Sequence, residues 1–169
     1  RLKLSAGRRK YEANLDAYDL YLRGRHAMEG FPARGRPTAL SAVKYFEEAI
    51  SRNAGYAIAY AGIADAFLAI EANMGAANGV NALPRARVAA ERAVELDPML
   101  SEAQSAMASI RVRDYAWQDA ERGFRRAIEL NPNNALAHLE LGVLVLVERG
   151  RSDEGLSEVR RAAALDPLS

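Results

Sequence analysis

The stretch that decides the fold is residues 120–132, AERGFRRAIELNP. Residues 86–98 repeat it as ARVAAERAVELDP, residues 155–167 as GLSEVRRAAALDP, and residues 42–54, more distantly, as AVKYFEEAISRNA. Three of the copies close on a proline, at positions 98, 132 and 167, so these copies are spaced 34 and 35 residues apart. Self-similarity at a fixed period of roughly 20–50 residues indicates a repeat architecture.

Each copy has the spacing of an amphipathic helix. Ala120, Phe124 and Ala127 recur at i, i+4 and i+7, with Arg and Glu between them. The helix ends before the proline, because a residue that precedes proline is driven out of the helical region. Second apolar segments flank the copies, at 17–28, 57–70, 101–112 and 135–147. No sustained apolar/polar alternation bounded by Asn-Gly or Asp-Gly turns is present, so no strand is predicted.

We therefore predict an all-α chain of eight helices, paired into four helix-turn-helix repeats. The predicted helices span about 14–29, 37–52, 55–73, 83–97, 99–114, 117–130, 133–149 and 152–166. The predicted repeat domain covers 14–169, with units at about 14–54, 55–98, 99–132 and 133–167. One helical pair cannot bury its apolar face alone, whereas stacked pairs bury a continuous core.

Two insertions lengthen the units, at residues 30–38 and 71–83. Their Gly, Pro and Asn content predicts surface loops at both places. Such a loop is either an insertion tolerated at a helix turn or a binding element, since loops often carry function. The sequence leaves both alternatives open.

The period, the helical hairpin in each unit and the closing proline resemble the tetratricopeptide repeat (TPR) family. The matching residues include Ala86, Ala90, Ala93 and Pro98, then Ala120, Phe124, Ala127 and Pro132, then Leu141, Gly142, Ala162 and Pro167. The resemblance covers about residues 14–169. Gly155 replaces the usual alanine, and Gln104 and His138 replace the usual bulky aromatic residue. Residues 17–25 and 59–66 look like repeat segments of bacterial signalling proteins.

The resemblance implies a right-handed α-solenoid whose first helices line a concave groove that holds a partner segment. The implied groove residues are Ile58, Asp65, Leu68, Glu102, Ser105, Ser109, Val112, Leu136, Leu139, Val143 and Leu146. The last four, in the fourth unit, are wholly apolar. An uncovered apolar patch indicates a docking surface for an apolar helix or extended segment. Coverage of this patch by neighbouring repeats of a longer protein is the alternative.

Catalytic, cofactor and metal sites are not expected. The two histidines, His26 and His138, lie in different units, and neither has a metal-ligating spacing. His138 occupies a core-facing position, so we expect it to be packed, and His26 to face solvent. The chain has no cysteine, no Gly-x-Ser-x-Gly turn, and no glycine-rich loop between a strand and a helix. An enzyme is therefore the least favoured class.

The charge balance argues against nucleic acid or membrane as a partner. Lys plus Arg total 23 and Asp plus Glu total 22, which leaves a net charge of +1. Apolar runs such as Val143–Val147 are far shorter than the ~20 residues that cross a bilayer. We interpret the basic residues 1–13 as a linker remnant from an upstream domain. No signal-like segment opens the chain, and we expect a cytoplasmic protein.

Two functional hypotheses follow from the sequence. The favoured one is a non-catalytic protein-interaction scaffold within a larger regulatory protein, and the alternative is a ligand-sensing or oligomerisation domain that controls a fused effector. A homodimer is also expected through the last helix. Leu156 and Ala163 lie on its outward side, and natural arrays normally cover that side with a polar capping helix.

Overall fold

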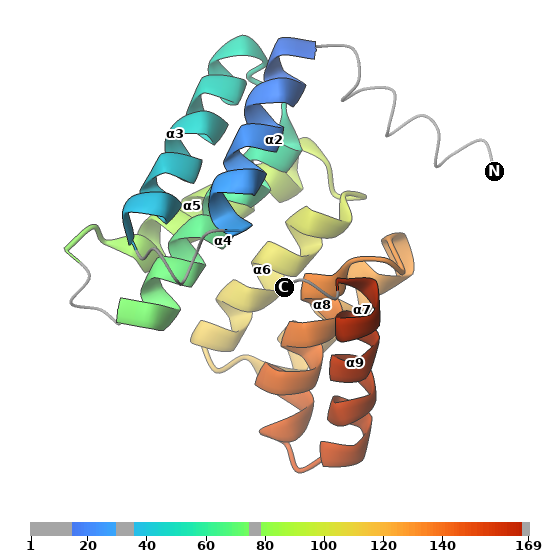
Figure 1. Cartoon of the computed structure of the whole chain (residues 1–169). Coiled ribbons are helices and arrows are strands. Elements are labelled where there is room, and N and C mark those ends of the chain that lie inside the picture. The colour runs from blue at the N-terminus through green and yellow to red at the C-terminus, as the bar shows by residue number, and fades with distance from the viewer. Residues whose placement is uncertain (1–14, 30–35, 75–78, 167–169) are drawn as a thin grey trace. The chain divides into compact units, whose positions relative to one another are not determined.

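The computed structural model describes residues 15–29, 36–74 and 79–166, and within these ranges it is all-helical (Figure 1). The chain divides into two compact units, Arg1–Leu96 and Asp97–Ser169. From here on, the first and second units are these two parts of the chain, and the four shorter segments predicted from the sequence are called repeats. Each unit holds helices that pack in consecutive antiparallel pairs. The residues between the described ranges include most of the insertion predicted at 30–38 and part of that at 71–83.

The first unit contains α2 (Leu15–Glu29), α3 (Arg36–Arg52), α4 (Ala57–Met74) and α5 (Ala82–Leu96). In Figure 1 these helices run from blue to green. The most extensive contacts join α2 to α3 and α4 to α5, and α3 packs on α4 to link the two pairs. Because α4 also touches α2, it is covered on several sides, as its almost wholly apolar sequence requires.

An aromatic cluster forms the centre of the first pair. Tyr21 on α2 lies 5.8 Å from Phe46 and 6.1 Å from Tyr56, measured between ring centroids. Phe46 fits between two glycines, Gly24 and Gly62, and a Cβ on Gly62 would approach the ring to 2.7 Å. These glycines therefore allow the close approach of α2 and α4 to one phenyl ring. Burial raises the pKa of the Tyr56 hydroxyl to about 12, and Tyr21 and Tyr18 add to the effect.

The second unit contains α6 (Ser101–Arg113), α7 (Trp117–Leu130), α8 (Ala135–Glu140), η2 (Leu141–Val147) and α9 (Ser152–Leu165). The segment η2 is π-helical and continues α8 without a break, so the two form one helix. This unit is drawn from yellow to red in Figure 1. α6 pairs with α7, and α8 with η2 pairs with α9.

Alanines, branched aliphatic residues and one phenylalanine form the core of the second unit. Phe124, Leu141, Val145 and Leu146 are fully buried in it, and Trp117 packs against its edge. The last two helices cross at backbone distance, because a Cβ on Gly142 would lie 2.6 Å from the carbonyl oxygen of Gly155. Gly155, which departs from the family's alanine, is thus required by this close approach.

The turns between repeats share one hydrogen-bond pattern. A side-chain oxygen accepts a backbone N–H two residues ahead at Asn53 (3.1 Å), Asp97 (3.0 Å) and Asn131 (3.1 Å). Asn and Asp favour such Asx turns because their short side chains reach the following backbone. The sequence repeat therefore recurs in the hydrogen bonds of these three turns.

The structure confirms the prediction of an all-helical chain with pairwise packing. The described ranges contain eight helices when α8 and η2 count as one, and their ends agree with the predicted ends within two residues. Two details differ from the sequence analysis. The insertions predicted at 30–38 and 71–83 are shorter than expected, because α3 begins at Arg36 and α4 continues to Met74, and the helix predicted over 133–149 contains the π-helical segment. Residues 1–13, interpreted as a linker remnant, lie outside the described ranges.

Candidate functional site

The predicted groove residues of the first unit lie on α4, and neighbouring helices cover most of the surface of this helix. Ile58 and Asp65 are half-buried, and Leu68 is only 5% exposed. The assignment of Leu68 to an open surface is therefore wrong. The reason is that α4 packs with α2, α3 and α5, so a residue on either flank of the helix meets a neighbour.

The predicted groove residues on α6 face α8 instead of solvent. Ser105 and Ser109 are each 2% exposed, and Val112 belongs to the hydrophobic core. The Ser109 hydroxyl bonds to Glu140 of α8, which shows that this row of α6 lies in a helix–helix contact. The surface assignment of Ser105, Ser109 and Val112 is thus wrong, whereas Glu102 on the same helix is half-buried.

Four apolar side chains on α8 and η2 are exposed in one row. They are Leu136 (39%), Leu139 (39%), Val143 (44%) and Val147 (45%), and we call this row the apolar stripe. The sequence analysis included the first three and missed Val147. It placed Leu146 in this row, but Leu146 is fully buried in the core.

The shift from Leu146 to Val147 falls within the π-helical segment. A π-helix bonds each N–H to the carbonyl five residues back instead of four, so each turn holds roughly one more residue. Leu146 faces the core of the second unit, whereas Val147 lies four residues after Val143 and is exposed. Helical spacing allows either residue to follow Val143, because i+3 and i+4 both lie on the same face. The run LGVLVLV offered the only signal, since its apolar residues fit more than one register.

A buried polar cluster lies behind the apolar stripe, between α6 and α8. Burial raises the pKa of Glu140, although the hydrogen bond with Ser109 and the charge of Arg113 oppose this shift. The Ser109 hydroxyl also lies 3.1 Å from the carbonyl oxygen of Ser105. Ser105 Oγ is buried and has no hydrogen-bond partner among the described residues. The bond between Ser109 and Glu140 joins two successive repeats.

His138 is packed as expected from the sequence, with 6% of its surface exposed. Its Nδ1 lies 2.6 Å from Glu158 Oε2 on α9, and its Nε2 lies 3.1 Å from the carbonyl oxygen of Pro132. Both partners are acceptors, so His138 connects α8 to α9 and to the turn before α8. His26 faces solvent, as expected, and pairs with Glu29.

Ion pairs connect α7 to the start of α9. Arg125 lies between Glu121 (3.0 Å) and Glu154 (2.5 Å), and Arg151 lies between the same two carboxylates at 2.7 and 2.5 Å. Burial acts to raise the pKa of Glu121, but the hydrogen bonds from Arg151 and Arg125 outweigh it, and the pKa is lowered. The hydrogen bond from Arg125 is also the main reason that the pKa of Glu154 is lowered. These ion pairs hold α7 against the start of α9.

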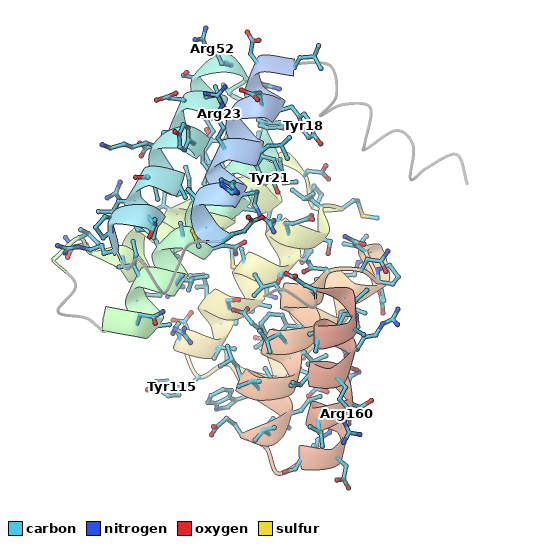
Figure 2. The ribbon with its side chains drawn as sticks, in the orientation of Figure 1. Tyr18, Tyr21, Arg23, Arg52, Tyr115 and Arg160 are labelled. Carbon is cyan, nitrogen blue, oxygen red and sulfur yellow. The ribbon has the colours of Figure 1, made fainter. Side chains whose placement is uncertain are left out.

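The predicted self-association residues lie on the outer face of α9. Leu156 is 47% exposed, and Ala163 is exposed as well. Seven residues separate them, so they lie on the same side of the helix, two turns apart. Arg160 and Arg161, which are both exposed, flank Ala163. Figure 2 shows Arg160 pointing outward from α9.

Sequence reasoning missed an open hollow at the turns of the second unit. Tyr115, Ala116, Trp117, Gln118, Asp119 and Arg149 line a volume of about 520 Å³. Tyr115 is 77% exposed and has a φ of +59°, in the left-handed region that a residue with a side chain rarely adopts. The available signal was positional, because Gly150 occupies the corresponding place in the next repeat with a φ of +75°.

No metal site or membrane-spanning helix is found among the described residues. No group of three or more His, Asp or Glu side chains there is arranged to hold a metal ion. None of the described helices combines the length and the apolarity that crossing a bilayer requires.

The chain is similar to solved structures of TPR proteins, although no protein-family model and no curated protein sequence matches it. TTC0263, a thermophilic TPR protein of Thermus thermophilus, superposes with a TM-score of 0.69 at 19% identity, over 97% of this chain and 81% of that one. MamA gives 0.53 at 16% identity, over 97% and 86%. MamA 41-end from Desulfovibrio magneticus RS-1 gives 0.53 at 17% identity, over 94% and 79%.

The fold is therefore that of a TPR-like helical repeat protein. The likeness extends over almost the whole chain, and the identities are below 20%. At such identities the likeness establishes the architecture of paired helices. Function has to be argued from the surface of this chain.

Proposed function

We propose that this chain is a non-catalytic protein-interaction module that binds an apolar helix of a partner protein on the apolar stripe of α8 and η2. The observation that carries the proposal is the row of four exposed apolar side chains, each with 39–45% of its surface open to solvent. Apolar groups aligned along one helix seldom stay uncovered, because water contact with a contiguous apolar patch is unfavourable.

The dimensions of the stripe fit a helical partner. Its residues lie at positions 136, 139, 143 and 147, so eleven residue steps separate the first from the last. At about 1.5 Å of rise per residue this corresponds to roughly 16 Å, or three turns of a helix. A partner helix that places apolar residues at i, i+3 or i+4, and i+7 presents a matching ridge. A scaffold role in a larger regulatory protein, the role expected from the sequence, is consistent with such docking.

The experiment selects binding peptides from a random pool. A displayed library of random helical peptides is panned against the wild-type protein, and the dissociation constants of selected peptides are measured by fluorescence anisotropy. The double variant Leu139→Glu/Val143→Glu removes the centre of the stripe and should weaken binding at least tenfold. Because both residues are exposed, its stability should change little, by about 0.5 kcal/mol or less for each site.

The matched control is Val88→Glu, which introduces the same charge at a position that is 67% exposed on α5. Its affinity for the selected peptides should equal that of the wild-type protein. The selected peptides should also share apolar residues at helical spacing. Equal affinity of the wild-type protein and the double variant would contradict the proposal, as would a selected set without this spacing.

A second proposed role is self-association through α9. Leu156 and Ala163, both exposed on one side of this helix, support it. Sedimentation velocity over a concentration series should show a dimer for the wild-type protein and a monomer for Leu156→Glu. A monomeric wild-type protein at the highest concentration would exclude this role and leave the peptide-binding role unaffected.

A further inference from the structure

The hollow at the two turns of the second unit has the features of a ligand site that is separate from the apolar stripe. One side comes from the α6–α7 turn with Tyr115 and Trp117, and the other from the η2–α9 turn with Arg149. Its volume of about 520 Å³ lies within the range of roughly 300–1,000 Å³ that is usual for binding pockets. We infer that this site binds a proline-rich segment in the extended polyproline II conformation.

Two aromatic rings form the apolar part of the site. The rings of Tyr115 and Trp117 meet edge to face, with centroids 5.9 Å apart and planes at 73°. Trp117 is half-buried against the core and holds one wall in place, whereas Tyr115 is 77% exposed. Figure 2 shows the Tyr115 side chain standing away from the ribbon. Two angled aromatic faces of this kind suit the compact, apolar pyrrolidine ring of proline.

The backbone at Tyr115 supports a role beyond folding. The Ala116 N–H donates to the carbonyl oxygen of Arg111 (2.9 Å) and the Tyr115 N–H to that of Val112 (3.0 Å), which is a Schellman motif with Tyr115 in the left-handed position. The same motif follows η2, where Arg151 and Gly150 donate in the same way (2.8 and 3.0 Å). Glycine suits this position without strain. A tyrosine held there, with its ring in solvent, indicates a surface function.

The polar groups of the site that are not in ion pairs carry more donors than acceptors, and the exposed Gln118 amide supplies both. Asp119 is paired with Arg122, and the nearby Glu121 is paired with Arg125 and Arg151. Arg149, which also lines the hollow, has its Nη1 3.7 Å from Glu121 Oε2. Within the described ranges, no protein hydrogen bond engages the Trp117 indole N–H or the Tyr115 hydroxyl. These groups can therefore donate to a ligand.

This donor excess selects the class of ligand. A proline-rich segment offers backbone carbonyl acceptors and almost no N–H donors, because proline lacks the amide hydrogen. Its carbonyls are free, since the polyproline II helix has no internal hydrogen bonds. A cationic ligand is disfavoured, because Arg149 lines the hollow and the acidic groups are paired. The aromatic rings of the site can therefore pack on proline rings, while its N–H and O–H donors bond to the carbonyl oxygens of the segment.

The inference does not depend on the function proposed for the apolar stripe. The two sets of residues do not overlap, and the probes differ: an oligoproline here and amphipathic helical peptides there. Failure at one site therefore leaves the other standing.

The test uses the single tryptophan of the chain as its reporter. Trp117 is the only tryptophan, so indole fluorescence reports on this site alone. An oligoproline peptide with acetylated and amidated ends is titrated into the full chain. We expect a saturable change in Trp117 emission, and no change with a Gly-Ser peptide of the same length. A lysine-rich peptide of that length is the third arm, and it should not saturate.

The decisive variant is Tyr115→Gly, with Tyr18→Ala as its matched control. Glycine suits the positive φ at position 115, so this variant should fold, as thermal unfolding by circular dichroism can verify. It should weaken oligoproline binding about tenfold, which corresponds to 1.4 kcal/mol. Tyr18→Ala removes another exposed tyrosine, on α2, and should bind like the wild-type protein.

Three results would overturn the inference. The first is the absence of a saturable signal with oligoproline. The second is equal affinity of the wild-type protein and a folded Tyr115→Gly variant. The third is stronger saturation with the lysine-rich peptide, which would assign the aromatic pair to cations instead of prolines.

Discussion

The two hairpins of the second unit, α6–α7 and α8–η2–α9, follow one repeat pattern but differ where their helices cross. In the first hairpin, Ala108 on α6 closely approaches Gly123 on α7, and in the second, Gly142 approaches the backbone of Gly155. α6 is a regular α-helix, whereas α8 continues into π-helical η2. Two copies of one repeat can therefore keep the same helical hairpin and still expose different side chains to solvent.

The surfaces of the two first helices differ accordingly. On α6, the row of Ser105 and Ser109 is polar and covered by α8. On α8 and η2, the corresponding row is apolar and exposed. The repeat consensus therefore specifies the paired helices, while the interaction surface belongs to the individual repeat.

The largest expected effect tests the register of η2. Leu146→Ala should lower the free energy of unfolding by about 2–5 kcal/mol, because it opens a cavity in the core. Val147→Ala, one residue later, should cost about 0.5 kcal/mol or less, because Val147 is 45% exposed. Chemical denaturation of both variants measures this difference. Reversed magnitudes would show that Val147, and not Leu146, is the residue packed in the core.

The next effect concerns the glycine crossing. Gly142→Ala should destabilise the protein by about 1–3 kcal/mol, although alanine normally favours a helix, because the new Cβ would meet the Gly155 backbone. In the first hairpin, Ala108→Gly should cost about 1 kcal/mol from helix propensity, in addition to the loss of a buried methyl group. Thermal unfolding compares the two variants. A stabilising Gly142→Ala substitution would mean that the helices cross farther apart than the structure shows.

A smaller, pH-dependent effect separates the buried carboxyl from the paired ones. Burial raises the pKa of Glu140 above its ordinary value, so its contribution to stability is present at low pH and is lost as the pH rises through that raised pKa. Glu140→Gln should therefore raise the melting temperature at pH 7, and this advantage should shrink toward pH 4. A melting temperature that is equally changed at both pH values would contradict this assignment.

The smallest effect concerns the ion pairs of α7 and α9. Glu154→Gln should cost less than about 1 kcal/mol at neutral pH, since exposed ion pairs contribute little. The pKa values of Glu121 and Glu154 are lowered, so their contribution is present above the ordinary pKa of a glutamate and is lost as the pH falls below it. Unfolding of the wild-type protein and the variant at two salt concentrations measures this contribution, and the difference between them should shrink at high salt.

The sequence predicted the helical pairs well because the repeat signal is local. The apolar spacing of Ala120, Phe124 and Ala127 and the prolines at the repeat ends determine helix type and limits without long-range information. Only a small part of the candidate surface was predictable in this way. Leu136, Leu139 and Val143 are exposed as the spacing indicated, whereas the choice between Leu146 and Val147 depends on packing that helical spacing does not determine.

Contacts between elements that are distant in sequence explain both the residues that were misplaced and the hollow that was missed. Ser105 and Ser109 are polar, and polarity alone argues for exposure, yet α8 covers them and Ser109 bonds to Glu140. The Tyr115 hollow was missed for a different reason, since its parts come from two turns that are distant in sequence. Contacts between elements decide both cases, and one chain read by period does not contain them.

The placement of Phe46 between Gly24 and Gly62 has a consequence for how this sequence can change. A methyl group at either glycine would collide with the same ring, so the three positions constrain one another across three helices. A single enlargement should be harmful, whereas its combination with a smaller residue at position 46 should be partly rescued, with a coupling of about 0.5–3 kcal/mol. Substitutions at these positions are therefore expected to appear together in descendants of this chain.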